Sequence, residues 1–260
     1  MTKYFKVWLL LCSSSFQSFF VSRIGSVLFL TGKILRFLFF FAFLILIVSK
    51  TNALAGYNFW QVMLFYLTFN LVDTITQMLF REVYRFRQYI ISGSFDLLLV
   101  KPVNVLFRSL FGWTDFLDSI NIIPLIFLII YVGTKISDIT FWSVALYFFL
   151  VVNSLMIAMS FHIYVLALGI LTTEIDHAIM IYRDVTSMGR FPIDIYSEPL
   201  RSFITFVLPV GILMSLPAKA MLGVVNFGTV ILSVMISLIF FSLSIILWRY
   251  SLKKYTSASS

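Results

Sequence analysis

Residues 141–171 read FWSVALYFFLVVNSLMIAMSFHIYVLALGIL, a run of 31 positions without a lysine, arginine, aspartate or glutamate. A helix needs about 20 predominantly apolar residues to cross the hydrocarbon core of a bilayer. A helix that is apolar on every face is buried either in a large protein core or in a membrane. The stretch therefore predicts a transmembrane helix in an integral membrane protein.

Five further apolar runs accompany this one, and they cover residues 27–49, 58–80, 109–133, 203–222 and 226–248. The sequence thus predicts an all-α, polytopic membrane protein with six transmembrane helices. Pro209 and Pro217 interrupt the run at 203–222, where a broken helix followed by a re-entrant turn is expected. We expect one membrane domain over residues 1–260, with the six-span bundle at 25–250 and a tail at 251–260.

The composition excludes an ordinary soluble domain. Hydrophobic residues make up 61% of the chain and charged residues 12%, whereas soluble domains are roughly 45–50% apolar and about 25% charged. Cys12 is the one cysteine, which excludes an internal disulfide framework and a thiolate metal cluster. The net charge of +8 indicates anionic lipid and membrane topology rather than nucleic acid, because the basic residues lie between apolar runs.

The first 24 residues resemble a signal peptide at first sight, since Lys3 and Lys6 precede the apolar residues 7–11. No convincing small-x-small cleavage site follows them. We therefore expect residues 1–24 to form an uncleaved amphipathic helix in the membrane interface.

Basic residues predict the orientation. With the N-terminus in the cytoplasm, six spans place sixteen basic residues inside and only Lys50, Lys135 and Lys219 outside, which is a strong positive-inside bias. Both termini are then cytoplasmic in the plasma (inner) membrane. The two long cytoplasmic loops are expected at 81–108 and 172–201.

A polar stripe runs along the second predicted span at helical spacing. It consists of Asn70, Asp73, Thr74 and Gln77. Because a carboxylate is costly in lipid, the stripe must face protein or water. It therefore predicts either the lining of a translocation path or interhelical hydrogen bonding, the latter with Arg81, or with Asp115 and Asp118 pairing to Arg108.

Catalytic motifs are missing from the sequence. Gly25 and Gly32-Lys33 lack the spacing and the Ser/Thr of a phosphate-binding loop. His162 and His177 lack zinc-type spacing, and there is no Gly-x-Ser-x-Gly elbow. Glu174, Asp176 and His177 could bind a metal, but adjacent polar residues at a helix end are more often solvated. We expect neither an enzyme nor a metal site.

Residues 93–102 read GSFDLLLVKP. They resemble the Gly-Thr-Leu-Glu-x-Leu-Leu-x-x-Pro segment that type-2, exporter-type ABC transporter permeases carry between their second and third spans. Residues 189–196, GRFPIDIY, with Pro209 and Pro217 after them, resemble a bacterial six-span branch of that family. The acidic stretch that many members have before the glycine is replaced by residues 88–92, QYIIS.

The resemblance implies that residues 93–102 form a cytoplasmic coupling helix that docks onto an ATPase. Its expected coupling residues are Gly93, Phe95, Asp96, Leu97, Leu98, Leu99, Lys101 and Pro102. Asp96 suits a helix N-terminus, Leu97 to Leu99 give an apolar face, and Pro102 ends the helix.

The resemblance further implies the membrane-spanning permease subunit of an ABC exporter. This chain would bind no cofactor, because ATP and Mg²⁺ would bind two copies of a separate ATPase subunit. A second permease, identical or homologous, would complete the complex in the lipid bilayer. Aromatic spans and a path with few fixed charges suggest an amphipathic cargo, such as a drug, a lipid or a peptide.

Two other classes remain as alternatives. The first is an ion-coupled secondary carrier that uses Asp73, Asp115 and Asp118, which inverted repeats in the two halves would support. The second is a membrane-bound transferase, for which the sequence offers no catalytic cluster.

Overall fold

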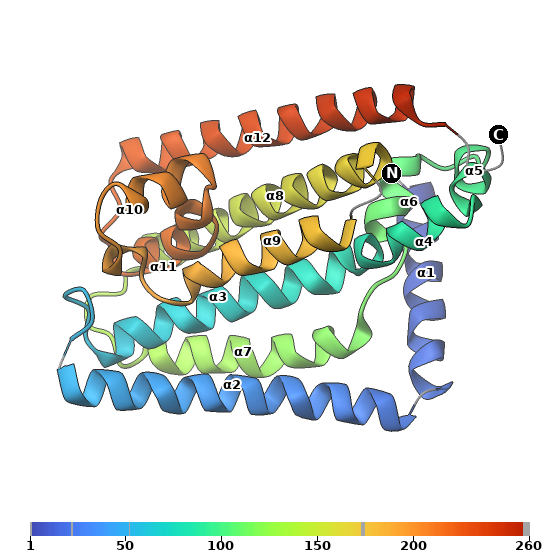
Figure 1. Ribbon diagram of the computed structural model, residues 1–260. Helices are drawn as coiled ribbons and strands as arrows, with labels where there is room; N and C mark the ends of the chain where they lie inside the picture. The colour runs from blue at the N-terminus through green and yellow to red at the C-terminus, as the bar shows by residue number, and fades with distance from the viewer. Residues whose placement is uncertain (1, 22, 52, 173–174, 257–260) are drawn as a thin grey trace.

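The computed structural model describes residues 2–21, 23–51, 53–172 and 175–256, and these residues form helices without a β-strand. Five helices are long and apolar enough to cross a membrane. They are α2 (Arg23–Thr51), α3 (Phe59–Phe80), α7 (Phe116–Gly133), α8 (Phe141–Thr172) and α12 (Phe227–Lys254). They run side by side in one bundle (Figure 1). The predicted all-α polytopic membrane fold is confirmed.

The bundle has two ends that differ in what they carry. We call the end where α3 stops at Phe80 and α12 stops at Lys254 the terminal end, because both chain termini lie there (Figure 1). The opposite end, with Tyr57 before α3 and Asn226 before α12, is the distal end.

Side-chain caps set where the spanning helices begin. Asn58 and Gln61 form a capping box at the start of α3, in which each side chain accepts a hydrogen bond from the other residue's backbone N–H. The Asp115 carboxylate accepts a hydrogen bond from the Leu117 N–H at 3.1 Å, so α7 begins at Phe116 rather than at residue 109. The preceding residues form a separate short helix, α6 (Val105–Phe111).

After α8, helix α9 (Ile175–Ser187) and the turn η2 (Met188–Arg190) run from the terminal end toward the distal end of the bundle. At the terminal end, Asp176 Oδ2 pairs with Arg87 Nη1 at 2.9 Å. Beyond η2 the chain is already at the distal end, where the Tyr57 hydroxyl donates to Asp194 Oδ2 at 3.1 Å. The segment is therefore not the loop that was expected at 172–201, because most of it is a helix along the bundle. The sequence did not predict this helix because its polar residues lower its hydropathy, and two of them, Arg183 and Arg190, line a cavity.

The residues expected to be the fifth span, 203–222, form a re-entrant hairpin at the distal end. One arm is α10 (Leu200–Ser202) with η4 (Phe203–Val207), and the other is η5 (Gly211–Ser215) with α11 (Leu216–Met221). The arms are bent by 80° at Pro209, which lacks a backbone N–H. The Ser154 hydroxyl, in the middle of α8, donates to Ile212 O at 3.5 Å.

Both arms of the hairpin open toward the distal end. Lys219 Nζ donates to Asp194 Oδ1 at 2.8 Å, and Arg201 shares a small cavity with Lys219 and with Thr229 at the start of α12. The hairpin thus enters and leaves at one end. With α9 and η2 included, the described helices pass six times between the two ends of the bundle, and the last pass, made by α12, returns the chain to the terminal end.

Short helices cover the terminal end. α1 (Thr2–Val21) lies across the bundle end rather than along it (Figure 1), as expected of an interfacial helix. Lys3 Nζ donates to Pro102 O at 2.9 Å, which ties α1 to the loop between α5 (Ser94–Leu99) and α6. Before α5, the turn η1 (Arg81–Arg85) and α4 (Phe86–Ile91) continue from α3.

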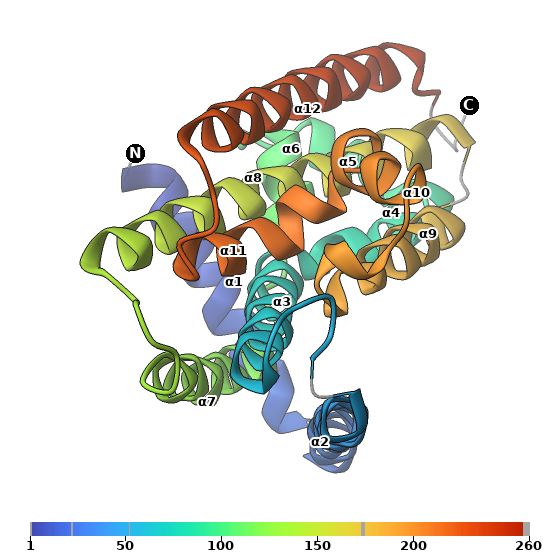
Figure 2. The same cartoon turned by 90° about the vertical axis from the view of Figure 1, so that its left-hand side faces the viewer.

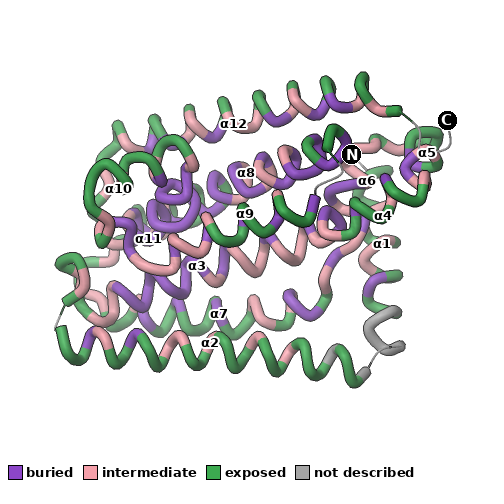
Figure 3. The backbone as a smooth tube through the Cα atoms, in the orientation of Figure 1, coloured by how far each residue is buried: buried purple, intermediate pink, exposed green. Residues whose placement is uncertain are grey.

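The core lies around α3, α8 and the inner arm of the hairpin, η5 with α11, and Figure 3 shows many buried residues along them. α12 packs against α8 and buries four serines on one side, which are Ser233, Ser237, Ser244 and Ser251. Their hydroxyls donate to carbonyls of their own helix. Small residues of this kind allow membrane helices to approach closely.

Candidate functional site: a polar cavity and a short helix at the terminal end

A cavity of about 1060 Å³ lies within the bundle, lined by residues of α2, α3, η1, α7, α9 and η2. Pockets for small ligands commonly measure about 300–1,000 Å³. All four residues of the predicted stripe line it, namely Asn70, Asp73, Thr74 and Gln77. The structure thus brings the stripe to one wall of a single cavity, opposite α2.

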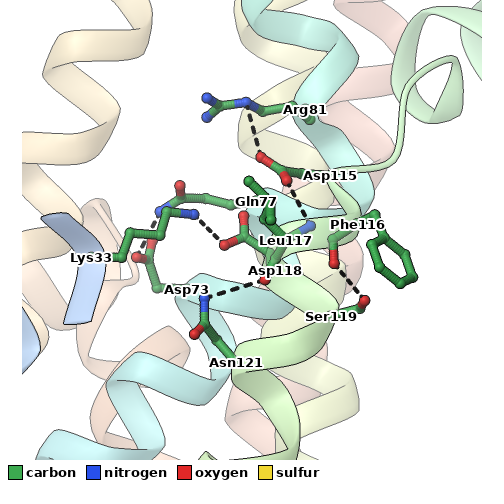
Figure 4. A network of polar contacts seen from close by, with 10 residues as sticks. All are labelled: Lys33, Asp73, Gln77, Arg81, Asp115, Phe116, Leu117, Asp118, Ser119 and Asn121. Atoms are coloured by element: carbon green, nitrogen blue, oxygen red, sulfur yellow. Dashed lines mark hydrogen bonds and ion pairs between the residues drawn. The ribbon is translucent and has the colours of Figure 1, made fainter. Parts of the chain in front are cut away.

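Hydrogen bonds within α3 hold three members of the stripe. Gln77 Nε2 donates to Asp73 Oδ2 at 2.7 Å, and Asn70 Nδ2 donates to Tyr66 O at 2.7 Å. Figure 4 shows Asp73 and Gln77 close to Lys33 of α2. The Asp73 carboxylate is therefore held by a neutral amide of its own helix.

Two ion pairs connect α7 to its neighbours, and Figure 4 shows both. Lys33 Nζ of α2 pairs with Asp118, whose side chain is buried. Arg81 Nε lies 3.6 Å from Asp115 Oδ2. The expected pairing of Asp115 and Asp118 with Arg108 is wrong, because Asp115 lies beside Arg81 of η1 and Asp118 pairs with Lys33 of α2.

Arg108 instead belongs to a buried cluster around Glu82, a residue to which sequence reasoning gave no role. Arg108 Nη1 donates to Glu82 Oε1 at 2.7 Å, and the Tyr89 hydroxyl donates to the same oxygen at 2.8 Å. Glu82 is fully buried. The cluster fixes α6 to η1 and α4 at the terminal end of the bundle.

Basic side chains are numerous on the cavity wall, so the expectation of few fixed charges along the path is wrong. The cations are Lys33, Arg36, Arg81, Arg183 and Arg190, and the carboxylates are Asp73 and Asp118. The sequence did not predict this arrangement, because Arg183 and Arg190 were expected in a cytoplasmic loop. They line the cavity because α9 and η2 run along the bundle.

Aromatic rings form much of the remaining wall. The Tyr66 ring stacks on Phe37 and Phe40 of α2, with centroid distances of 5.3 and 4.9 Å. The Arg190 guanidinium lies 5.6 Å from the ring centroids of both Phe40 and Phe69. The wall therefore combines flat apolar surface with cations.

The predicted coupling segment forms α5 at the tip of the terminal end (Figure 1). Gly93 precedes it with φ +70°, a left-handed conformation that glycine adopts without strain. This residue reverses the chain between α4 and α5.

The side chains of α5 divide into an inner and an outer set. Phe95 and Leu98 are buried, whereas Leu97 is 64% exposed and Val100, just beyond the helix, is 80% exposed. Consecutive residues lie about 100° apart around a helix, so Leu97 to Leu99 do not form the single apolar face that was expected. Of the predicted coupling leucines, Leu97 and Leu99 face outward.

Phe95 connects α5 to the rest of the bundle. Its ring contacts Phe86 of α4 at 5.1 Å and Tyr255, just after α12, at 5.0 Å, and Phe86 contacts Trp248 at 6.4 Å. Burial and the neighbouring Asp96 carboxylate raise the pKa of the Tyr255 phenol. α5 therefore rests on α4 and on the end of α12.

The candidate metal residues do not gather into a centre. Asp176 pairs with Arg87, and Glu174 lies outside the described residues. Within the part of the chain that the structure describes, no three metal-ligating side chains lie together. His162 is buried in α8, where its Nδ1 lies 2.8 Å from Ala158 O.

The bundle of long apolar helices defines a multi-pass membrane protein. The family model described as "ABC-2 family transporter protein" matches residues 34–259. The chain therefore belongs to the ABC-2 transporter family and is an ABC permease subunit. Neither the curated proteins nor the solved structures contain a match to it.

Proposed function

We propose that this permease subunit belongs to an ATP-driven exporter and that the cavity forms part of its translocation path. Two copies of a separate ATPase subunit supply the energy, and a second permease, identical or homologous, completes the path. ATP and Mg²⁺ bind the ATPase, and this chain binds no cofactor.

The observation that carries the proposal is that α5 has one side buried against the bundle and one exposed apolar side. The exposed side, with Leu97 and Val100, presents apolar surface at the tip of the terminal end. The buried side, with Phe95 and Leu98, fixes the helix to the bundle. A helix anchored on one side and apolar on the other suits docking to a partner protein.

The contacts of Phe95 connect α5, where the ATPase docks, to α4 and to the end of α12. A displacement of α5 acts directly on Phe86 and Tyr255, and through Phe86 on Trp248 of α12. The buried Glu82–Arg108 pair joins the same region to α6. ATP-driven movement of the ATPase would therefore change how α12 and α4 pack, which is the kind of shift that alternating access requires.

The orientation follows from charge. We assign the terminal end to the cytoplasm and the membrane to the plasma (inner) membrane. Lys3, Lys6, Arg249 and Lys253 lie on terminal-end elements, and positive residues favour the cytoplasmic side. Arg201 was expected on the cytoplasmic side and lies at the distal end instead, but this one difference does not reverse the excess of basic residues at the terminal end.

Co-purification tests the proposal. The tagged chain is co-expressed with an ATP-binding-cassette ATPase from the same genome, and ATP hydrolysis is measured on the purified membrane fraction. Leu97→Asp should insert normally, because Leu97 is exposed, and should lose the ATPase. Burying one leucine contributes about 1.5–3 kcal/mol, so docking should weaken about tenfold or more.

The matched control is Val224→Asp, at an exposed apolar position of the distal end. This variant should retain the ATPase. Leu98→Asp, in contrast, should lower the amount of folded chain itself, because Leu98 is buried. Full ATPase retention by Leu97→Asp and Val224→Asp alike would contradict docking at α5.

The ion-coupled carrier alternative gains no support from these contacts. It uses Asp73, Asp115 and Asp118 as ion-linked groups, yet two of the three are engaged by cations, Asp115 by Arg81 and Asp118 by Lys33. Proton-driven transport by the lone chain in sealed vesicles would favour the carrier instead.

A further inference from the structure

We propose that the cavity binds the anionic headgroup of an amphiphile, whose apolar chain lies against the aromatic wall on α2. This inference rests on the proposed function, because it names the class of cargo that the same cavity accepts. The group recognised is a phosphate or a carboxylate carried by a lipid-like molecule.

The first argument is the excess of positive charge. Five cationic side chains line the cavity, from α2 (Lys33, Arg36), η1 (Arg81), α9 (Arg183) and η2 (Arg190), against two carboxylates. Asp176 and Asp184, the acidic residues of α9, are not among the lining residues. A cavity with this balance attracts anions and repels cations.

The second argument is the way the charges pair. Lys33 is neutralised by Asp118, and Arg81 lies beside Asp115. Asp73 accepts its hydrogen bond from the amide of Gln77. Among the described residues, no ion pair within 4.0 Å is formed by the three remaining cations, which are Arg36, Arg183 and Arg190.

The third argument is the depth of these arginines. Arg36 lies 13 residues along α2 from Arg23, which is about 20 Å at 1.5 Å per residue. Arg183 lies in the middle of α9. A charge at such depth is costly unless it meets a counter-charge or water, and intramembrane charges mark binding sites by default.

Arginine also fits the proposed headgroup by shape. The guanidinium is planar and matches the oxygens of a phosphate or carboxylate with two parallel hydrogen bonds. The Arg190 guanidinium is positioned by Phe40 of α2 and Phe69 of α3, each at 5.6 Å. An anion in the cavity would therefore meet a donor that is already oriented.

The fourth argument is the apolar part of the wall. Leu28, Phe39 and Phe43 of α2 line the cavity and are also 67%, 73% and 47% exposed. The cavity lining thus continues onto the outer face of α2, which faces lipid. An acyl chain can lie on this continuous surface while its headgroup stays among the arginines.

The test is a binding measurement on the full chain in neutral detergent. The probes are a fluorescent short-chain phosphatidic acid and a phosphatidylcholine with the same chains. We expect the phosphatidic acid to bind at least tenfold more tightly. Arg36→Gln with Arg183→Gln should abolish that preference, whereas Arg249→Gln, an exposed change on α12 outside the cavity, should leave it unchanged.

A second variant protects the test against misfolding. Asp73→Asn removes a negative charge from the same wall, so it should tighten phosphatidic acid binding by about threefold. A misfolded protein does not gain affinity. Equal binding of the two lipids, or weaker binding by Asp73→Asn, would overturn the proposal.

Inorganic phosphate separates a lipid headgroup from a free anion. Unlabelled phosphatidic acid should displace the probe at concentrations where inorganic phosphate does not, because the apolar wall contributes to binding. Equal displacement by both would overturn the assignment to an amphiphile.

The experiments distinguish a failure of the proposed function from a failure of this inference. Lipid binding needs only this chain, whereas docking needs the ATPase. A complex that hydrolyses ATP but binds both lipids equally would overturn the cargo class alone, and a chain that prefers phosphatidic acid but recruits no ATPase would overturn the exporter alone.

Discussion

Tyr57 and Asp194 meet at the distal end, where the Tyr57 hydroxyl donates to Asp194 Oδ2 at 3.1 Å. Tyr57 belongs to the connection between α2 and α3, and Asp194 follows α9 and η2. Asp194 also pairs with Lys219 of α11 at 2.8 Å. This junction places the segment after η2 at the distal end, so α9 with η2 runs from one end of the bundle toward the other.

The junction predicts the accessibility of the chain between η2 and α10. In a Cys12→Ala background, Ser197→Cys should react with an impermeant thiol reagent in intact cells, because Ser197 is exposed beside the distal end. Ser94→Cys, in α5, should react only after the membrane is opened. Protection of Ser197→Cys in intact cells would restore the cytoplasmic loop expected from the sequence.

The Glu82–Arg108 pair predicts a large stability effect. Glu82→Gln leaves the Arg108 guanidinium without its carboxylate partner in a buried site, and breaking a buried pair costs about 3–5 kcal/mol. The melting temperature in detergent should fall by several degrees. Glu198→Gln, in the exposed pair with Arg201, is the control and should melt like the unaltered chain, so equal melting of both variants would contradict the structural role of Glu82.

The left-handed conformation of Gly93 predicts a selective effect on coupling. Gly93→Ala places a Cβ at φ +70°, which costs about 1–2 kcal/mol and should displace α5. ATP hydrolysis by the assembled complex should fall, while membrane abundance changes little. Asn tolerates this conformation better, so Gly93→Asn should recover part of the activity, and full activity of Gly93→Ala would show that the turn is unimportant.

Hydropathy predicted the five long helices, because each contains an apolar stretch long enough to cross a bilayer. It failed for α9, since the cavity face of that helix carries Arg183 and nearby Asp184 lowers its hydropathy further. The apolar hairpin at 203–222 took its place in the prediction. A helix that lines a polar cavity carries polar residues on that face, so its composition resembles that of a loop.

The site was predicted only in part. Helical spacing was enough to group Asp73 with its three stripe neighbours, because that relation is local. The Glu82–Arg108 pair joins residues 26 positions apart, and no local pattern reveals such a partner. Likewise, three consecutive leucines indicate an apolar helix, but only packing shows that Leu98 faces inward and Leu97 outward.

Cross-linking from α5 tests the central claim most directly. A photoreactive amino acid is placed at Leu97 or Val100 in the complex with its ATPase, with the same amino acid at Val224 as the distal control. We predict an ATPase cross-link from residues 97 and 100 and none from residue 224. ATPase co-purification without a cross-link from either α5 position would contradict docking through this helix.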